Sequence, residues 1–526
     1  MNGTLQLIRL ALRRDRVLLP VWLSMFVLLA VGSAAATKGM FPSTESVAAA
    51  ADSMNGTPAL VAVYGRIYDP SSIGALAMLK ALATGAMILA VFSIIVVVRH
   101  TRSDEESGRR ELIGAGVVGR HAPLAAALAV AAGANILLGL VTSLGLAGAG
   151  LPVDGSFVFG LAWISVGLAF AAIAGITAQV ATSTRGAVGL AVAVLGVVFV
   201  LRAVGDTADV AGPRWLSWLS PLGWGQQFRP YAGNRWWVVL ITLGFAVVAA
   251  VVAHLLAARR DLNTGLLPDR PGPATGALRG VFGLAWRLHR GSLLGWVVGF
   301  VVYGVLVGSV AGSIGDMIST PQAAELFRKL GGDNALTDAV FAAMLGFLGV
   351  IASVYGLQTA MRLHSEETEL RAESLLATPV TRGRWAASHV VIALVGTAVL
   401  LVSAGLAAGA VHAAQTGDPS VVGKVLAGAL VQIPAAWVLV GIAFAAYGLA
   451  PRLFVVGWSA LVVFLLLGEL GPMFGFDQWL MDLSPWAHLP KVPGSAVTAT
   501  PLVWLLAIAA AGLITGFAGL RRRDVV

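Results

Sequence analysis

Cysteine is absent from the 526 residues of this chain, and charged residues are scarce. The missing thiols exclude disulfides, cysteine-ligated zinc, iron–sulfur clusters and thiol nucleophiles. Asp, Glu, Lys and Arg together make up 12% of the chain, roughly half of their usual share in soluble globular proteins. Because 58% of the residues are hydrophobic, such a chain cannot cover a water-facing surface. The composition therefore predicts an all-α polytopic membrane protein.

Catalytic motifs are missing as well. The sequence has no G-x-x-x-x-G-K-[ST] phosphate loop, no H-E-x-x-H and no G-x-S-x-G, and its 8 histidines are scattered. The single G-x-G-x-x-G, at 114–119, is expected by chance in so glycine-rich a chain. We therefore expect no catalytic residue, no bound cofactor and no metal site in this chain. Nucleic-acid binding is also excluded, since no basic patch interleaved with aromatic residues occurs.

Apolar stretches long enough to cross a bilayer, about 20 residues each, recur along the whole chain. Twelve predicted spans lie near 17–36, 76–98, 122–146, 157–181, 187–204, 236–258, 291–312, 340–360, 387–411, 422–449, 453–470 and 500–520. An even number of spans returns both ends of the chain to the same side. With both termini in the cytoplasm, 24 of the 35 basic residues fall on that side, as the positive-inside rule requires.

Self-comparison shows one six-helix unit written twice. Ser103-Asp104-Glu105 matches Ser365-Glu366-Glu367, and Arg120 matches Arg382, all at an offset of 262. Further on, Arg259-Arg260-Asp261 matches Arg522-Arg523-Asp524 at an offset of 263. Repeats of six spans insert in the same orientation, so we expect a pseudo-twofold axis along the membrane normal. The predicted organisation is a repeat at 1–258, a turn-rich cytoplasmic linker at 259–290 and a second repeat at 291–526.

The first apolar stretch and the residues before it leave alternatives open. Residues 17–31 followed by Ala34-Ala35-Ala36 resemble a cleavable signal peptide. The internal repeat favours an uncleaved anchor, because the counterpart of this stretch lies near residue 291. Residues 5–14 are compatible with a short amphipathic helix at the headgroups or with an extension of the first span.

Charged segments after the second and eighth spans are the main candidates for function. Both copies place an acidic pair six residues before a glutamate, which is followed nine residues later by an arginine. An ordinary solvated loop need not keep that spacing, so we favour a protein-docking surface. The predicted docking residues are Glu105, Glu106, Glu111, Glu366, Glu367, Glu373, Leu375 and Leu376.

The second of these segments, Glu366-Glu367 through Glu373-Ser-Leu-Leu-Ala-Thr-Pro379-Val-Thr-Arg382, resembles the coupling helix of type-2 ABC exporter permeases. The two-repeat layout, the Pro268-Asp-Arg-Pro-Gly linker and Leu-Arg202-Ala-Val-Gly-Asp206 resemble, more narrowly, the fused permeases of polyketide-antibiotic (tetronasin-like) exporters. This resemblance covers nearly the whole chain and favours the amphipathic N-terminal helix. It also implies short re-entrant helices at 212–234 and 471–497. The first copy departs from the pattern, with Gly116-Val117 in place of Thr378-Pro379.

The resemblance implies the membrane-spanning permease subunit of an ATP-driven exporter in the bacterial inner membrane. Two separate nucleotide-binding ATPase subunits would bind ATP and Mg, and dock near 99–120 and 361–385. The expected substrate is a small or bulky apolar compound, such as a polyketide antibiotic or another drug. The alternative is a secondary multidrug transporter driven by an ion gradient. That class calls for acidic residues in mid-membrane, whereas nearly every acid here falls in a loop or at the end of a span.

Two charges and four aromatic residues complete the predicted sites. Arg202 and Glu469 occupy matching positions at the outer ends of the fifth and eleventh spans, so we predict a charge pair near the outer mouth. Snorkelling of both side chains to the interface is the alternative. The candidates for lining the substrate path are Phe92, Phe199, Tyr355 and Phe464, although core packing would explain these residues equally well.

Overall fold

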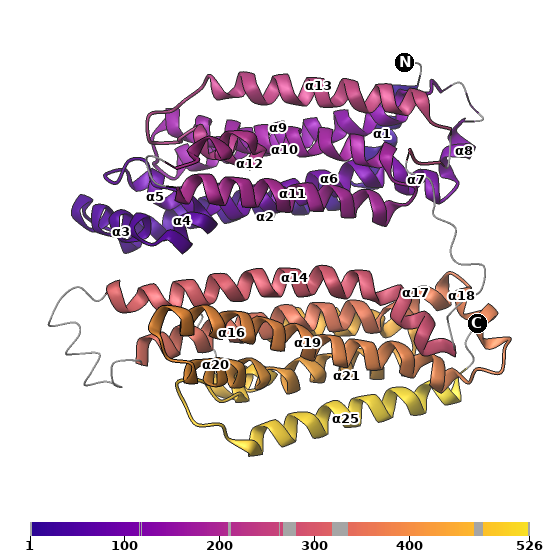
Figure 1. Cartoon of the computed structure of the whole chain (residues 1–526). Coiled ribbons are helices and arrows are strands. Elements are labelled where there is room, and N and C mark those ends of the chain that lie inside the picture. Colours follow the sequence, from indigo (N-terminus) through magenta and orange to yellow (C-terminus); the bar gives the residue numbers. More distant parts are fainter. Residues whose placement is uncertain are drawn as a thin grey trace. The chain divides into compact units, whose positions relative to one another are not determined.

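The computed structural model describes residues 3–114, 116, 118–208, 212–261, 264–266, 280–317, 335–465, 467 and 477–523. Throughout these residues the regular structure is helical and includes no strand. The chain forms two compact units, Met1–Pro271 and Gly272–Val526, each of which is an all-α bundle (Figure 1).

Eleven helical segments of the described residues are long and apolar enough to cross a membrane. They match eleven of the twelve predicted spans, which confirms the prediction of an all-α polytopic membrane protein. The remaining span, predicted at 453–470, is described only in part, as the short apolar segment Pro451–Leu465. Eleven spans are thus found among the described residues, and the twelfth stays a prediction.

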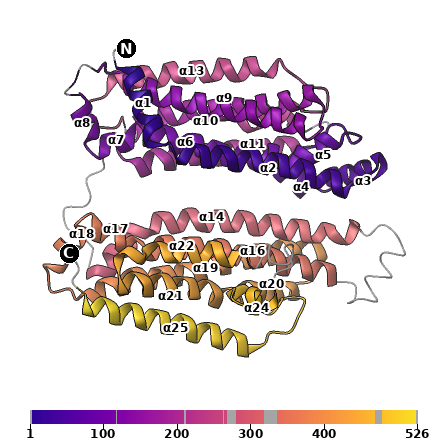
Figure 2. The ribbon, with the colours of Figure 1, turned by 180° about the vertical axis from the view of Figure 1, so that it is seen from behind.

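The first unit begins with a short helix set at a steep angle to the second (Figure 2). Its helices are α1 (Thr4–Arg14), α2 (Leu18–Met40), α3 (Thr44–Gly56), α4 (Pro58–Tyr64), α5 (Ile73–Lys80), α6 (Ala86–Arg99), α7 (Arg102–Glu106), α8 (Arg109–Gly114), α9 (Ala122–Gly148), α10 (Val153–Val180), α11 (Thr184–Thr207), α12 (Pro221–Gln227) and α13 (Val238–Arg259). A π-helical turn, Ala81–Gly85, joins α5 to α6, and a 3-10 turn, Arg214–Leu219, precedes α12. The separate α1, with its apolar and its charged faces, agrees with the amphipathic alternative.

The second unit contains α14 (Gly280–Met317), α16 (Ala335–Ala360), α17 (Arg362–Thr368), α18 (Arg371–Leu376), α19 (Arg382–Thr416), α20 (Ser420–Leu430), α21 (Ile433–Leu449), α22 (Val455–Leu465), α24 (Gln478–Met481) and α25 (Ala499–Arg522). The predicted linker at 259–290 needs a correction, because α14 already begins at Gly280. Residues 280–290 therefore belong to the first long helix of this unit.

Helix α10 forms the centre of the first unit, and most of its side chains are buried. Trp163 lies at its middle, where it contacts Phe26 and Phe159 and donates a hydrogen bond to the Ala81 carbonyl. That carbonyl lies in the π-helical turn. The indole also fills the space beside Gly85, at which a β-carbon would come within 2.8 Å of the ring. Close packing of this kind leaves no room for a change in volume.

Helices α21 and α25 of the second unit touch backbone to backbone. A β-carbon on Gly448 would lie 2.2 Å from the Gly516 carbonyl oxygen, and one on Gly519 would lie 2.6 Å from the Gly448 oxygen. Gly441 and Gly512 make a similar contact nearer the middle of the two helices. Small residues let transmembrane helices approach closely, and dispersion contacts then hold them together.

We predict that Gly448→Val separates α21 from α25 and destabilises the protein by about 2 kcal/mol, the usual size of an overpacking penalty. Thermal unfolding of the detergent-purified chain would measure the loss. Gly244→Val is the matched control, because Gly244 lies in α13, where a β-carbon meets nothing within 4 Å. Equal destabilisation by the two changes would contradict the close contact.

Candidate coupling site

Each unit carries a pair of short helices directly after its second long helix. In the first unit the pair is α7 and α8, joined at Gly108, and in the second it is α17 and α18, joined at Leu370. Gly108 has φ 72° and Leu370 has φ 59°, so the same left-handed turn separates the helices in both pairs. Leucine adopts this conformation at a cost of about 1–2 kcal/mol. The turn therefore belongs to the repeat even where the residue does not favour it.

Glu105 is the centre of a buried ion network in the first unit. Both of its oxygens accept hydrogen bonds from Arg260, at 2.6 and 2.7 Å. Arg102 and Arg110 lie 3.3 and 3.1 Å from the same carboxylate. Arg260 also donates to the Gln179 side chain at 2.7 Å. Paired carboxylate and guanidinium groups of this geometry form strong, charge-assisted bonds, which fix α7 against the end of α13.

Glu367 occupies the corresponding place in the second unit. Both of its oxygens accept hydrogen bonds from Arg523, one of them at 2.8 Å. The hydroxyl of Tyr447 donates to the same carboxylate, and the Arg523 guanidinium lies 4.8 Å from the centre of the Tyr447 ring. These bonds raise the pKa of Arg523 against the opposing effect of burial. The C-terminal end of α25 is thereby fixed to α17.

A third residue completes the arrangement in each unit. Arg120 donates a 2.6 Å hydrogen bond to the carbonyl of Arg260, and Arg382 donates a 2.6 Å bond to the carbonyl of Arg523. Glu105, Arg120 and Arg260 thus form one constellation, and Glu367, Arg382 and Arg523 form its copy. The three strongest sequence anchors of the repeat are the residues that contact one another in the structure.

The first residue of each acidic pair, Asp104 or Glu366, binds different neighbours in the two units. Both oxygens of Asp104 accept 2.8 Å bonds from Arg14, which ties α7 to α1. Glu366 instead accepts bonds from Arg362 and from the Trp385 indole, each at 3.2 Å, and lies 3.3 Å from His389. In the second unit this acid is therefore bound to the first turns of α19.

Three of the predicted docking residues require a correction. Glu105, Glu366 and Glu367 are at most 5% exposed, and their oxygens are bound to side chains of their own unit. They hold the short helices in place instead of facing a partner. Sequence reasoning did not name the arginines Arg260 and Arg523 as site residues, although the self-comparison had already aligned them.

The other predicted docking residues lie nearer the surface. Glu106 is exposed and accepts a 2.9 Å bond from the Thr184 backbone at the start of α11. Glu111 and Glu373 are exposed, on α8 and α18. Leu375 and Leu376 are half-buried against the core of the second unit. The most exposed apolar side chains of the two segments are Leu112, at 80%, and Leu370, at 58%. The docking role itself stays a prediction.

Arg202 is buried near the end of α11 and is bound within its own unit. It donates hydrogen bonds to the carbonyls of Ala62 and Val63, the latter at 3.0 Å, and lies 3.9 Å from Asp206. Its guanidinium also stacks over Phe199, 4.9 Å from the ring centre. Glu469 lies outside the described residues, so the predicted pair between Arg202 and Glu469 stays a prediction.

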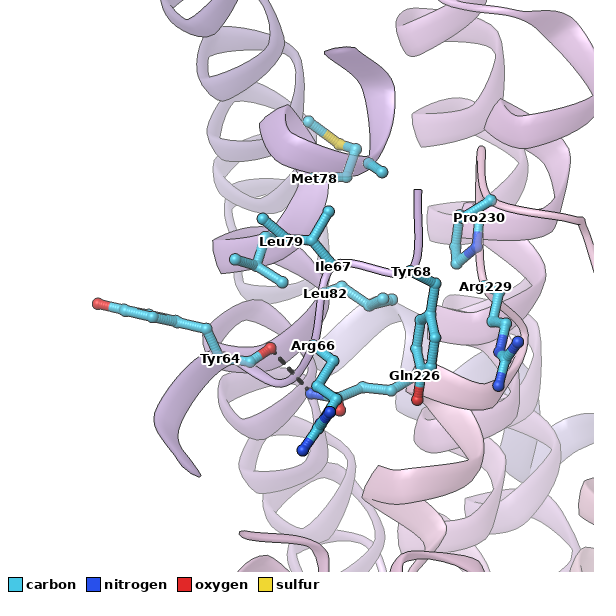
Figure 3. A pocket seen from close by; sticks show the side chains of 12 residues that line it. Tyr64, Arg66, Ile67, Tyr68, Met78, Leu79, Leu82, Gln226, Arg229 and Pro230 are labelled. Carbon is cyan, nitrogen blue, oxygen red and sulfur yellow. Dashed lines mark hydrogen bonds between the residues drawn. The ribbon is translucent and has the colours of Figure 1, made fainter. Parts of the chain in front are cut away.

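The loop between α2 and α5 folds onto the residues around α12. Gln226 donates a 3.0 Å hydrogen bond to the Tyr64 carbonyl, and Arg229 stacks 3.8 Å above the Tyr68 ring (Figure 3). Burial, together with the charge of Asp206, raises the pKa of the Tyr68 hydroxyl. The cavity among these side chains measures about 30 Å³, far less than the about 300–1,000 Å³ of typical ligand pockets. A cavity of this size is too small for a drug-sized molecule.

The predicted re-entrant segments are described as short helical turns. In the first unit all residues of α12 are buried. In the second, α24 and the 3-10 turn Pro485–His488 have four residues each.

The aromatic residues proposed for a substrate path pack inside their own units. Phe92 is buried and stacks on Trp22 at 5.1 Å, and Tyr355 is buried with its ring 6.2 Å from Trp296. Phe199 and Phe464 are half-buried and contact the hydrophobic cores of their units. Core packing accounts for all four, and their role in a substrate path stays a prediction. Among the described residues, no group of three or more His, Asp or Glu side chains could hold a metal ion.

Comparison with known proteins decides the family. The sequence model described as "Multidrug efflux system permease Rv1217c, C-terminal domain" matches residues 6–257 and 278–521, two stretches that coincide with the two repeats. The chain is also 46% identical over 533 residues to the multidrug efflux system permease protein Rv1217c of Mycobacterium tuberculosis (strain ATCC 25618 / H37Rv). That match covers 100% of this chain and 95% of the relative. The chain belongs to this family of efflux permeases. A permease of this family is a transport component, which agrees with a chain that lacks catalytic motifs.

We predict that Glu105→Gln destabilises this permease by about 3 kcal/mol, because it leaves buried arginines without their carboxylate. The double variant Glu105→Gln with Arg260→Gln should recover part of that loss, since the stability changes of substitutions at interacting residues are not additive. Thermal unfolding and the recovery of monodisperse protein would measure both effects. Glu373→Gln, an exposed glutamate of the other segment, is the control. Strict additivity in the double variant would contradict the pairing.

Proposed function

We propose that this permease is the membrane-spanning subunit of an ATP-driven exporter, and that separate nucleotide-binding subunits dock on its two coupling segments. The observation that carries the proposal is the repeated constellation of Glu105, Arg120 and Arg260 and its copy, which holds a buried short helix followed by a more exposed one at the same place in each unit. A surface repeated in this way suits two partner subunits of the same kind. Because the sequence has no phosphate-loop motif, we assign the binding of ATP and Mg to those partners.

The constellation gives the docking surface a mechanical connection to the membrane helices. In the first unit, Arg110 of α8 lies 3.1 Å from Glu105 of α7, which binds Arg260 after α13. Arg260 in turn binds Arg120, which precedes α9. In the second unit, α18 follows α17, whose Glu367 binds Arg523 after α25, and Arg523 binds Arg382 at the start of α19. Because each glutamate–arginine bond is bidentate, a displacement of the short helices would be passed on to these membrane helices. ATP binding in the partners would thereby move the third and sixth spans of each repeat together.

The finer features of the proposal follow from the family and from the charge distribution. The relative is a multidrug efflux permease, which supports drug efflux by this chain. We propose apolar compounds, including polyketide antibiotics, as its substrates. The excess of arginine at the ends of α1, α13 and α25 supports a cytoplasmic location of both termini in a bacterial inner membrane.

We predict that the purified permease hydrolyses no ATP and transports drug only with a co-expressed ATPase. Dye export from proteoliposomes, measured with and without the ATPase subunits and ATP, would test this. The ATPase subunits alone serve as the control for hydrolysis. Transport by the permease alone on a proton or sodium gradient would overturn the proposal in favour of a secondary transporter.

We predict that charge reversal in the second segment uncouples transport more severely than reversal in the first. Exposed Glu373 lies on α18 and exposed Leu370 directly precedes it, while Leu375 and Leu376 pack α18 on the core. The first segment ends α8 at Gly114 and includes Gly116 and Gly119, so it costs more entropy to order on docking. Glu373→Lys should lower drug-stimulated ATPase activity about tenfold, which corresponds to about 1.4 kcal/mol.

Glu111→Lys, measured at matched expression, is the comparison variant, and recovery of the complex would be followed in parallel. Equal losses, or a larger loss for Glu111→Lys, would refute the asymmetry between the segments. The docking role itself would be contradicted if neither variant weakened the complex.

A further inference from the structure

The chain breaks its first membrane helix in the first unit but not in the second. Helix α1 ends at Arg14 and α2 begins at Leu18. Asp15, at the break, is fully buried and is held by His100 and by Arg99, whose Nε lies 3.1 Å away. Arg16 and Trp22 match Arg290 and Trp296 at an offset of 274, which aligns Asp15 with His289. His289 lies within the uninterrupted helix α14. The break is therefore specific to the first unit and is stabilised by its own ion pair.

A groove opens beside this break, between α2 and α9. Its first part, a cavity of about 400 Å³, lies under α1 and is lined mainly by apolar residues of α1, α2 and α9. A second cavity, of about 420 Å³, continues it further along the same two helices. Leu23 and Leu137 line both cavities, so they form one apolar channel along the helix pair. Gly133, on the α9 side, has open space in front of it.

The matching helices of the second unit, α14 and α19, touch backbone to backbone further along. A β-carbon on Gly304 of α14 would lie 2.5 Å from the Ala404 carbonyl oxygen of α19, and one on Gly308 would lie 2.4 Å from the Ala408 oxygen. The first unit has Ala30 and Ala34 at the positions of these glycines, and both are buried beyond the groove. Its helices meet closely at Gly145, whose β-carbon would lie 2.8 Å from Val31. The groove thus ends before Gly145.

A positive charge stands at the open end of the groove. Arg16 lines the cavity under α1 and is exposed. Its neighbour Asp15 is engaged by Arg99 and His100, and Arg14 is paired with Asp104. In the described part of the chain no acidic side chain pairs with Arg16. An apolar channel with an uncompensated arginine at its mouth matches a molecule with a hydrocarbon tail and an anionic head.

We propose that this groove binds an anionic phospholipid of the leaflet that contains α1, with an acyl chain between α2 and α9 and the phosphate at Arg16. The groove runs from Arg16 to Leu28 on α2, which is roughly 18 Å at 1.5 Å per residue. One leaflet contributes about half of the roughly 30 Å hydrocarbon core, so the groove accepts most of one acyl chain. Basic sites between transmembrane helices are suited to anionic headgroups.

The experiment uses the full chain in nanodiscs with a single fluorescent label in the groove. Leu137→Cys places the label, and the absence of native cysteine makes the labelling specific. Phosphatidylglycerol and phosphatidylcholine with brominated acyl chains are compared as quenchers at equal low mole fraction. We expect phosphatidylglycerol to bind about fivefold more strongly, the effect of roughly one basic residue on an anionic lipid. Arg16→Gln should abolish this preference.

Two controls separate the site from the general charge of the surface. Arg13→Gln removes an exposed arginine at the end of α1 that does not line the groove, and it should leave the preference unchanged. A label at Val248→Cys, on the exposed face of α13, should show no preference between the lipids. Gly133→Leu, whose β-carbon meets nothing within 4 Å, places a larger side chain in the groove and should remove bound phosphatidylglycerol detected by native mass spectrometry.

Several outcomes would overturn the proposal. Equal quenching by the two lipids at Leu137, or equal effects of Arg16→Gln and Arg13→Gln, would exclude an anionic site. Absence of quenching by either lipid would show that protein covers the groove. Displacement of lipid by an apolar dye, with no dependence on headgroup charge, would assign the groove to drug binding.

Discussion

The bidentate bond between a glutamate and an arginine at the end of each unit is the contact on which the rest of the arrangement depends. Glu105 and Glu367 follow the second span of their repeats, and Arg260 and Arg523 follow the sixth. Each bond therefore connects the segment after the second span of its unit to the end of the last span. The desolvation of these charges is large and is offset only while both partners are in place. The short helices that carry the glutamates are thus held in a fixed position relative to the last span of their unit.

The two units surround this common bond differently. Arg260 shares Glu105 with two further arginines, and its guanidinium, like that of Arg102, donates to the Thr264 carbonyl in the first residues after α13. Arg523 shares Glu367 with the single hydroxyl of Tyr447. Positive charge is concentrated in the first network and an aromatic ring covers the second. The duplicated sequence has kept the bond and changed its environment.

Much of the fold could be predicted from the sequence, because long apolar stretches and an internal repeat have few structural solutions in a membrane. The placement of the docking residues could not. The positions of Glu105 and Glu367 were identified from their spacing, yet a charge in a polar segment gives no sign of whether it faces solvent or an arginine more than 150 residues away. The repeat alignment of Arg260 with Arg523 was the signal that could have identified these arginines as the partners of the two glutamates. The break at Asp15 also escaped prediction, since it depends on contacts with Arg99 and His100.

The glycine contact between α21 and α25 has a mechanical consequence. Backbones in direct contact leave no side chains that can change rotamer between them, so the two helices move as one rigid body. This body carries both partners of Glu367, Tyr447 on one helix and Arg523 on the other. In the first unit the corresponding contact is looser, because a β-carbon on Gly175 of α10 would meet Ala253 of α13 at an ordinary 3.4 Å. We therefore expect the two units to differ in stiffness, with the helix pair α21 and α25 of the second unit more rigid than the pair α10 and α13 of the first.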